Sequence, residues 1–232
     1  MLLLLLRSLL LTFFCFFPLK TITTAQRSKD DLKIVCSAAI IENDYEKRKE
    51  EYIKGLSLVK HYGYEPYVIE ACKKCGPTFL DDYVLSDRIF YSSVHNSALK
   101  NKGVNEAMTM LEGLNYFAFN DDDMIIKVTA RYYLVSDYFI KLVENNPTYD
   151  VFVLIAENGY AITGCFAMRY KYFKNMLETL DLTSLEKEFR CLEADVANYI
   201  RKIENKRNAR VMKVKKLDLL ARWALDGRIV RY

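Results

Sequence analysis

Residues 101–133, NKGVNEAMTMLEGLNYFAFNDDDMIIKVTARYY, decide the fold predicted for this chain. They hold an Asn-Lys-Gly turn, an amphipathic helical pattern over residues 104–116, three consecutive aspartates and a strand over residues 124–133. Strand side chains alternate between two faces, so Lys127, Thr129 and Arg131 share one face. We expect the apolar residues between them to pack on the other face.

The three aspartates, residues 121–123, allow two interpretations. Mg²⁺ and Mn²⁺ take carboxylate oxygens and usually keep a substrate phosphate among their ligands. Asp121 and Asp123, beside a cationic strand, are therefore candidate ligands of a divalent cation that holds a phosphate. The other interpretation is an acidic turn ahead of a strand with one solvated face.

The rest of the chain alternates apolar strands with amphipathic helices. A helix follows Asp44 and stops at Gly63, a second covers residues 136–145, a third residues 170–180, and a fourth, opened by a capping box from Thr183 to Glu186, residues 184–203. This alternation predicts an α/β fold with one mostly parallel central sheet and helices on both faces. Its predicted strands are residues 32–41, 66–71, 88–94, 124–133, 151–156 and 161–168.

Length and composition set wide bounds. A chain of 232 residues, 51% hydrophobic and 28% charged, is typical of one globular α/β domain. With two histidines in the chain, His61 and His95, zinc sites built on three histidines are excluded.

The first 25 residues are predicted to direct the chain to a membrane. A long apolar run ends at Pro18, and small residues precede Gln26, as in a secretory signal peptide. The run is also nearly long enough for a signal-anchor. We therefore expect a secreted or membrane-anchored protein of the secretory pathway, or an exported one, with the folded domain over residues 30–203.

Five cysteines follow this segment. Cys72 and Cys75 have a redox or half-zinc spacing, but Gly76-Pro77 follows at once and no second ligand pair is suitably spaced. We expect buried thiols or a local disulfide.

Residues 204–232 are predicted to form a basic helical extension. Residues 201–232 hold 11 Lys and Arg against 3 Asp and Glu. Such a tail either packs its Leu and Trp face on the domain or contacts an anionic membrane surface, and no nucleic-acid partner is expected.

The chain resembles nucleotide-sugar-dependent glycosyltransferases of the GT-A type over residues 32–203. Asn101-Lys102-Gly103 is similar to a segment that leads a helix toward an Asp-x-Asp motif in that superfamily, and Asp121 and Asp123 supply Asp-x-Asp. Residues 159–173 resemble the acceptor-side strand and turn. Residues 125–133, IIKVTARYY, resemble a Lys-x-Thr-Gly-Arg-Tyr segment, with Ala130 in place of Gly.

The resemblance implies a single GT-A (Rossmann-like) domain that transfers a sugar from a nucleoside-diphosphate sugar to a hydroxyl of a glycan, lipid or protein. It implies Mn²⁺ or Mg²⁺ at Asp121 and Asp123, which would offset charge on the leaving diphosphate. The residues that would bind the donor are Lys102, Lys127, Thr129 and Arg131. The carboxylates proposed as catalytic base are Glu193, Asp195 and Glu157.

Strand direction decides between two donor sites. If the aspartates precede the strand, they lie at the amino end of a parallel sheet, whereas ligands collect at the carboxyl ends. Thr129, Arg131 and Tyr132 would then face the ligand, and cationic side chains would bind the diphosphate. Two other functions stay open: an inactive GT-A-like domain that binds glycans or partners, and a nucleotidyltransferase-like enzyme acting on a nucleoside triphosphate.

Overall fold

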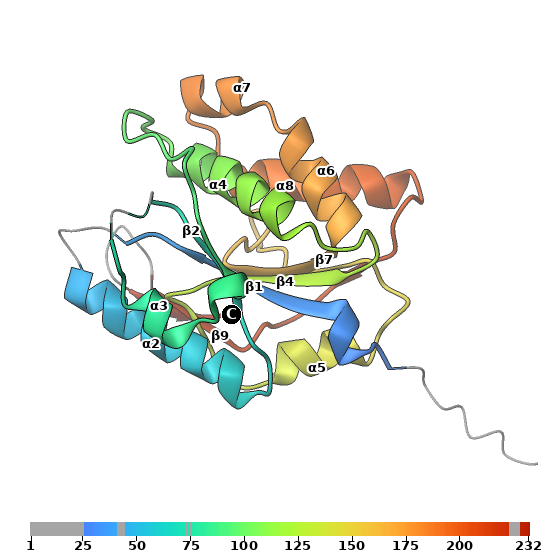
Figure 1. Cartoon of the computed structure of the whole chain (residues 1–232). Helices are drawn as coiled ribbons and strands as arrows, with labels where there is room; N and C mark the ends of the chain where they lie inside the picture. Colours follow the sequence, from blue (N-terminus) through green and yellow to red (C-terminus); the bar gives the residue numbers. More distant parts are fainter. Residues whose placement is uncertain (1–25, 41–44, 73, 75, 223–227) are drawn as a thin grey trace, which may run out of the picture.

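The computed structural model describes residues 26–40, 45–72, 74, 76–222 and 228–232 (Figure 1). The predicted signal segment, Lys73, Cys75 and Trp223 therefore lie outside the described residues.

A seven-stranded sheet forms the centre of the domain, in the order β3-β2-β1-β4-β7-β6-β8. Every neighbouring pair is parallel except those of β7, which is antiparallel to β4 and to β6. Each of the six predicted strands contributes a strand to this sheet, so the predicted mostly parallel α/β class is confirmed. The strands are β1 (Leu32–Ala38), β2 (Tyr67–Glu70), β3 (Ile89–Tyr91), β4 (Met124–Thr129), β6 (Val151–Val153), β7 (Cys165–Arg169) and β8 (Val211–Lys213).

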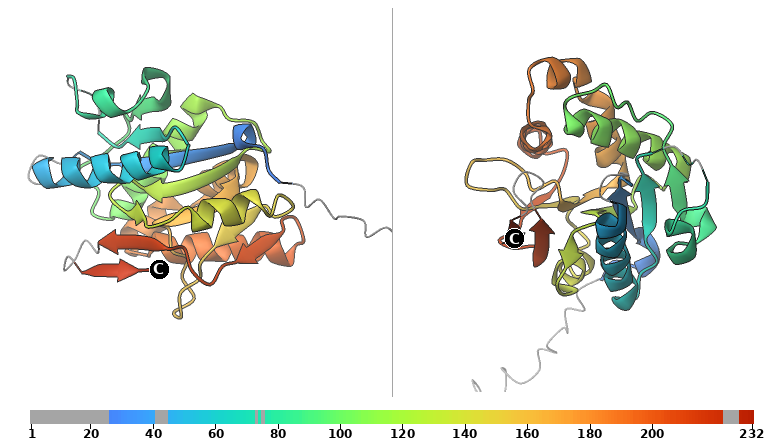
Figure 2. Two further views of the ribbon diagram at one scale, coloured as in Figure 1. Left: turned by 90° about the horizontal axis from the view of Figure 1, so that it is seen from below. Right: turned by 90° about the vertical axis from the view of Figure 1, so that its left-hand side faces the viewer.

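Helices cover both faces of the sheet (Figures 1 and 2). One face carries α4 (Lys102–Phe117), α6 (Tyr170–Thr179) and α8 (Leu192–Asn205), with α7 (Leu182–Lys187) beyond the start of α4. The other carries α2 (Tyr45–His61), α3 (Leu80–Tyr83) and α5 (Tyr138–Glu144). Short 3-10 turns, η1 (Lys29–Asp31) and η3 (Ser86–Arg88), precede β1 and β3.

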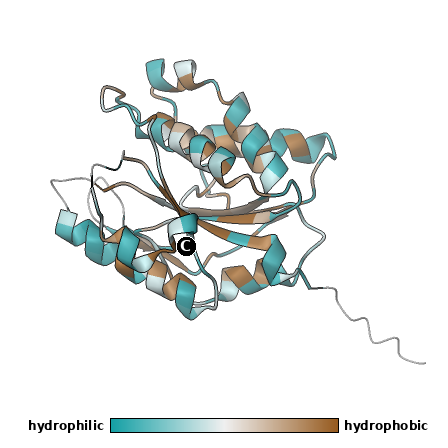
Figure 3. Cartoon of the chain, in the orientation of Figure 1, coloured by the Kyte–Doolittle hydropathy of each residue, from teal (hydrophilic) through white to brown (hydrophobic). Residues whose placement is uncertain are grey.

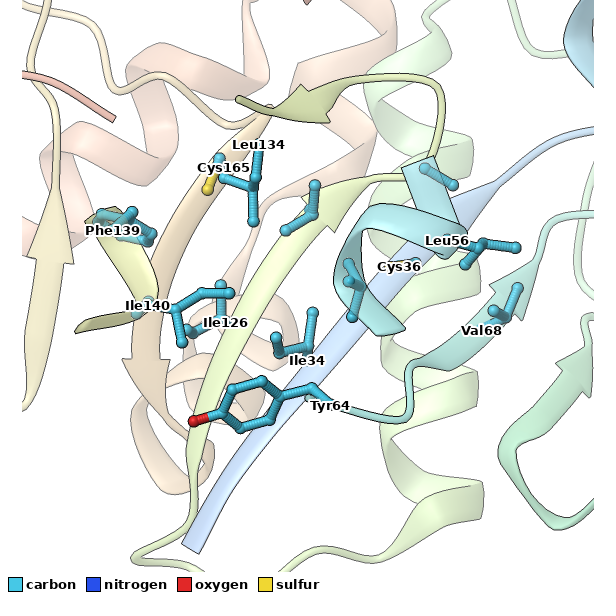
Figure 4. Close-up of a cluster of buried hydrophobic side chains, with 14 of the residues drawn as sticks. Ile34, Cys36, Leu56, Tyr64, Val68, Ile126, Leu134, Phe139, Ile140 and Cys165 are labelled. Carbon is cyan, nitrogen blue, oxygen red and sulfur yellow. The ribbon is translucent and has the colours of Figure 1, made fainter. Parts of the chain in front are cut away.

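Two apolar cores result from this layering, and the strands of Figure 3 are accordingly the most hydrophobic segments. The first core places Ile34, Cys36 and Ile126 of the sheet against Leu56 of α2 and Phe139 of α5 (Figure 4). The second lies under α4, α6 and α8. Cys36 and Cys165 are buried thiols without a disulfide partner, whereas the expectation for Cys72 and Cys75 stays a prediction.

α2 lies unusually close to the chain after β4. A Cβ at Gly55 would overlap the carbonyl oxygen of Ala130, so glycine alone fits this crossing. The helix stops as predicted at Gly63, whose φ of +85° is the left-handed conformation of a helix end.

The single helix predicted over residues 184–203 is wrong, because α7 and α8 are separate. Phe189, inside the predicted helix, has a φ of +49° and is 65% exposed. The predicted capping box is wrong too. Asp181 caps α7 by accepting from the Ser184 N–H, and Glu186 instead accepts from the backbone N–H groups of Lys100 and Asn101.

The helical extension predicted for residues 204–232 is also wrong. The segment contributes β8 to the central sheet, while β9 (Leu219–Arg222) and β10 (Ile229–Arg231) form a second sheet with β5 (Tyr133–Leu134). The physical reason is an alternation within β9: Leu219 and Ala221 are buried, whereas Leu220 and Arg222 are half-buried. The predicted strand 124–133 is likewise split between the two sheets.

Within the described ranges, no helix is long and apolar enough to cross a membrane. The predicted contact of the basic tail with a membrane surface stays a prediction.

Candidate functional site

The direction of chain crossing reverses between β1 and β4. From β1 the chain moves outward through β2 to β3, and α4 then returns it to β4 on the other side of β1. In open α/β sheets ligands bind at such a point, outside the carboxyl ends of the strands. Ser37 and Thr129, paired across β1 and β4, mark these ends.

Lys127 is the centre of a polar network at this point. Its side chain is 3% exposed, and its ammonium lies 2.6 Å from Glu106 Oε1, 2.8 Å from the Thr163 carbonyl oxygen and 3.0 Å from Thr129 Oγ1. An ammonium has three N–H donors, so all three are used. Lys127 therefore links α4, β4 and the segment before β7, and has no donor left for a ligand.

The network continues from Thr163 to Glu193 in the first turn of α8. Thr163 Oγ1 donates to Glu193 Oε1 at 3.1 Å, and Cys191 Sγ donates to Glu193 Oε2 at 2.6 Å. Burial and this carboxylate raise the pKa of the Cys191 thiol to about 11, so the thiol stays protonated and donating. A carboxylate offers about four acceptor positions, so Glu193 keeps some for a further donor.

The start of α4 is fixed by Asn101. Its Oδ1 accepts from the Gly103 N–H, and its Nδ2 donates to the carbonyl oxygens of Leu185 and Arg190. Lys102 is the first residue of the helix and is exposed. Because residues four apart lie on one helix face, Lys102 shares a face with Glu106, which contacts Lys127.

Arg131 lies in the turn that follows β4, outside the strand in which it was predicted. Its half-buried guanidinium lies 5.5 Å from the centre of the Tyr132 ring, and no carboxylate of the described residues forms an ion pair with it. Tyr132 in turn packs against Gly164, where a Cβ would come within 2.6 Å of the ring. Arg131 is therefore a cation with donors available at the carboxyl end of β4.

Glu70, at the carboxyl end of β2, is a buried acid at this edge. It is 1% exposed; Oε1 accepts from the Ile40 and Cys72 N–H groups, and Oε2 has no hydrogen-bond partner. Burial raises the pKa of this carboxyl to about 7, against the opposing effect of the two backbone N–H groups.

The three aspartates lie at the opposite edge, because they precede β4. The carbonyl oxygens of Asp121 and Asp123 accept from the N–H groups of Lys171 and Tyr170, at the start of α6. The Asp123 carboxylate is 4% exposed and accepts from the Asn120 N–H. The fold therefore does not bring Asp121 and Asp123 together with Lys127, Thr129 and Glu193.

The donor set around the aspartates fits a divalent cation poorly. Asp122 pairs with Lys171 at 2.9 Å, and this bond lowers the pKa of Asp122. In the part of the chain that the structure describes, no group of three His, Cys, Asp or Glu side chains is placed to hold a metal. The Mn²⁺ or Mg²⁺ ion stays a prediction.

The two other predicted bases lie outside the network. Asp195 forms an ion pair with Arg190 at 2.7 Å, which closes the turn between α7 and α8. Glu157 is exposed in the loop between β6 and β7.

A small cavity of about 20 Å³ lies behind the network, lined by Glu106, Lys127 and Thr163 and otherwise by apolar side chains. It has room for about one water molecule. The cavity is therefore too small for a ligand much larger than water.

The sequence did not indicate that Glu106, Thr163 and Glu70 belong to the site. It also did not indicate that Asn101 bridges α4 to the segment around α7. A signal for Glu106 was available, because it follows Lys102 by one helical turn. Thr163 and Glu70 had no local signal.

No family model matches this chain, and no curated protein matches it. One similar solved structure is a glycosyltransferase involved in the glycosylation of the major capsid of PBCV-1. It is 11% identical with a TM-score of 0.42, over 78% of this chain and 81% of that one. A distant structural neighbour is thus a glycosyltransferase, and similarity at this level carries no conclusion about the activity of this chain.

Proposed function

We propose that this chain transfers a glycosyl group from a nucleoside-diphosphate sugar to a hydroxyl acceptor. One observation carries the proposal: four separate segments bring Glu106, Lys127, Thr129, Thr163 and Glu193 into one network at the carboxyl ends of β1 and β4. A buried, fully bonded ammonium fixes these groups before a ligand arrives, as a site for charged intermediates requires.

Arg131 and Lys102 are the cations proposed to bind the diphosphate. Arg131 gives a permanently charged and bidentate contact to phosphate oxygens. Lys102 stands at the start of a 16-residue helix, where the helix dipole also favours an anion. Thr129 lies beside Lys127 and adds a hydroxyl. Lys127 acts as a positioning residue.

Glu193 is the proposed general base. In the transfer, the acceptor oxygen forms a bond to the anomeric carbon as the bond from that carbon to the diphosphate breaks. The acceptor proton passes to the Glu193 carboxylate, and the diphosphate leaves with the bonding electron pair beside Arg131. Thr163 and Cys191 hold the carboxylate in place during this step.

The aspartates have a structural role in this proposal. Asp121, Asp122 and Asp123 hold the start of α6 through backbone and ion-pair contacts, at the edge of the sheet opposite Thr129. The alternative donor site, with cationic side chains in place of the Asp-x-Asp motif, is therefore the one that the placement of these residues supports.

A donor panel tests the proposal. The full chain, incubated with UDP-, GDP- and CMP-linked sugars and a mixture of sugar and lipid acceptors, should release nucleotide from one donor class, and Glu193→Gln should suppress the release. Nucleotide binding without turnover would favour the inactive binding protein. Pyrophosphate release from a triphosphate panel would favour the nucleotidyltransferase, and no binding of any nucleotide would contradict the site.

A further inference from the structure

A second feature lies at the opposite edge of the sheet, where the strands begin. An open groove of about 460 Å³ is bounded by the starts of β1, β2 and β4 and by the end of α4. Its lining includes Lys33 of β1, Tyr67 of β2 and Asp123, which directly precedes β4. At about 3.3 Å per residue, the length of β4 separates this groove from Thr129 by roughly 17 Å. The proposed donor site makes no use of it.

Aromatic rings form one side of the groove. The Tyr67 ring meets Phe117 at 5.1 Å and Phe119 at 4.9 Å between ring centres, both edge to face, and Phe117 stacks on Phe119 at 5.6 Å. Such contacts fix ring orientation as well as burying area. The groove therefore has a rigid aromatic lining.

Tyr116 extends this lining toward solvent. Its ring packs on Phe90 at 4.7 Å and against Phe117 at 5.3 Å, yet the residue is 59% exposed. Neighbouring rings thus hold Tyr116 while much of it stays open. Because the Tyr116 ring is already fixed, a ligand that stacks on it would restrict few side-chain torsions and cost little conformational entropy.

Polar groups with free hydrogen-bonding capacity surround the rings. Asp87 and Asn120 are exposed lining residues, and within the described residues neither side chain forms a hydrogen bond. Lys33 contributes an ammonium that is bonded to the Asp30 carbonyl oxygen. The groove thus offers a carboxylate, an amide and an ammonium beside a stacking surface.

We propose that this groove binds a pyranose unit of a glycan. A pyranose presents an apolar C–H face, which suits an aromatic ring, and a rim of hydroxyl pairs, which suits a carboxylate and an amide. The mixed charge of Lys33, Asp87 and Asp123 disfavours a phosphate-rich ligand. Glycan binding at this groove is independent of the proposed transfer reaction.

Saturation-transfer difference NMR with cellotetraose, chitotetraose and mannotetraose tests the proposal on the full chain. At least one of these probes should bind with a Kd of the order of 1 mM. Tyr116→Ala should weaken that binding by about tenfold, the loss of one aromatic contact, while Tyr116→Phe retains the ring and the binding. Asp87→Asn should weaken it without changing the fold, because the side chain is exposed.

Two controls separate the groove from other sites. Tyr160→Ala removes a ring that is 40% exposed in the loop between β6 and β7 and should leave binding unchanged. Saturating UDP should not displace the oligosaccharide. Failure of all three probes to bind at about 10 mM would overturn the proposal. So would unchanged binding by Tyr116→Ala, or displacement by UDP.

Discussion

The ammonium of Lys127 and the carboxylate of Glu106, 21 positions apart in the chain, form an ion pair of 2.6 Å that joins β4 to α4. The lysine is buried whereas the Glu106 side chain is 36% exposed, so the ion pair lies at the boundary between the core and the solvent-exposed site. Lys127→Met would leave the Thr163 carbonyl oxygen and Glu106 without this donor.

We expect Lys127→Met to lower the free energy of unfolding by about 2 kcal/mol, less than for a fully buried pair because Glu106 reaches solvent. Urea denaturation followed by circular dichroism measures the change. Lys171→Met is the matched control: it breaks the exposed pair with Asp122 and should cost no more than about 0.5 kcal/mol. Equal effects in the two variants would mean that the network at Lys127 does not stabilise the site.

Glu193→Gln should lower kcat by about 10² to 10⁴, the usual contribution of a general base, with the donor Kd unchanged. Steady-state transfer assays and nucleotide titration measure the two quantities separately. Glu157→Gln, exposed and outside the network, should have wild-type kcat. If Glu157→Gln is the impaired variant, the base has been assigned to the wrong segment.

Gly55→Ala should destabilise the domain although alanine is the better helix former. The added methyl overlaps the Ala130 carbonyl oxygen, and overpacking of this kind costs about 1–3 kcal/mol, more than the gain of about 1 kcal/mol in helix propensity. Thermal denaturation measures the shift in Tm. Gly76→Ala, whose Cβ meets no atom within 4 Å, should leave Tm nearly unchanged.

Glu70 should make stability depend on pH. Its folded-state pKa of about 7 lies above the unfolded value of about 4.3, so the folded chain binds more protons between these values. Stability from this group is therefore present below pH 4 and lost as pH rises toward 7, by up to about 3 kcal/mol. Urea midpoints from pH 5 to 8 measure the slope. Glu70→Gln should flatten it, and an unchanged slope would assign the effect to another group.

The sheet was predictable because burial on two faces requires continuous apolar runs. Strands such as residues 32–38 are apolar nearly throughout, and α2 ends at a glycine with positive φ, as expected. The break between α7 and α8 carries no such signal, since the left-handed residue there is Phe189 rather than glycine. The strands of the C-terminal segment were missed because a high density of Lys and Arg hides an alternation of only a few residues.

Those contacts of the candidate site that lie within a single strand or helix could be predicted from the sequence. Strand alternation places Lys127 and Thr129 on one face, and their side chains do meet at 3.0 Å. Glu106 and Thr163 reach Lys127 across 21 and 36 positions, a relationship set by the packing of α4 and β7 against β4. The edge on which the aspartates lie likewise follows from the direction of β4 in the sheet.

The most direct test of the proposed donor site is a calorimetric titration of UDP into the wild-type chain, Arg131→Ala and the double variant Asp121→Ala/Asp123→Ala, each with Mn²⁺ and with EDTA. Arg131→Ala should weaken UDP binding by about 30-fold or more, because a bidentate charged contact is lost. The aspartate variant and EDTA should leave the Kd of UDP within about twofold of the wild-type value. Binding that requires Mn²⁺ and both aspartates, and that survives Arg131→Ala, would contradict the proposed donor site.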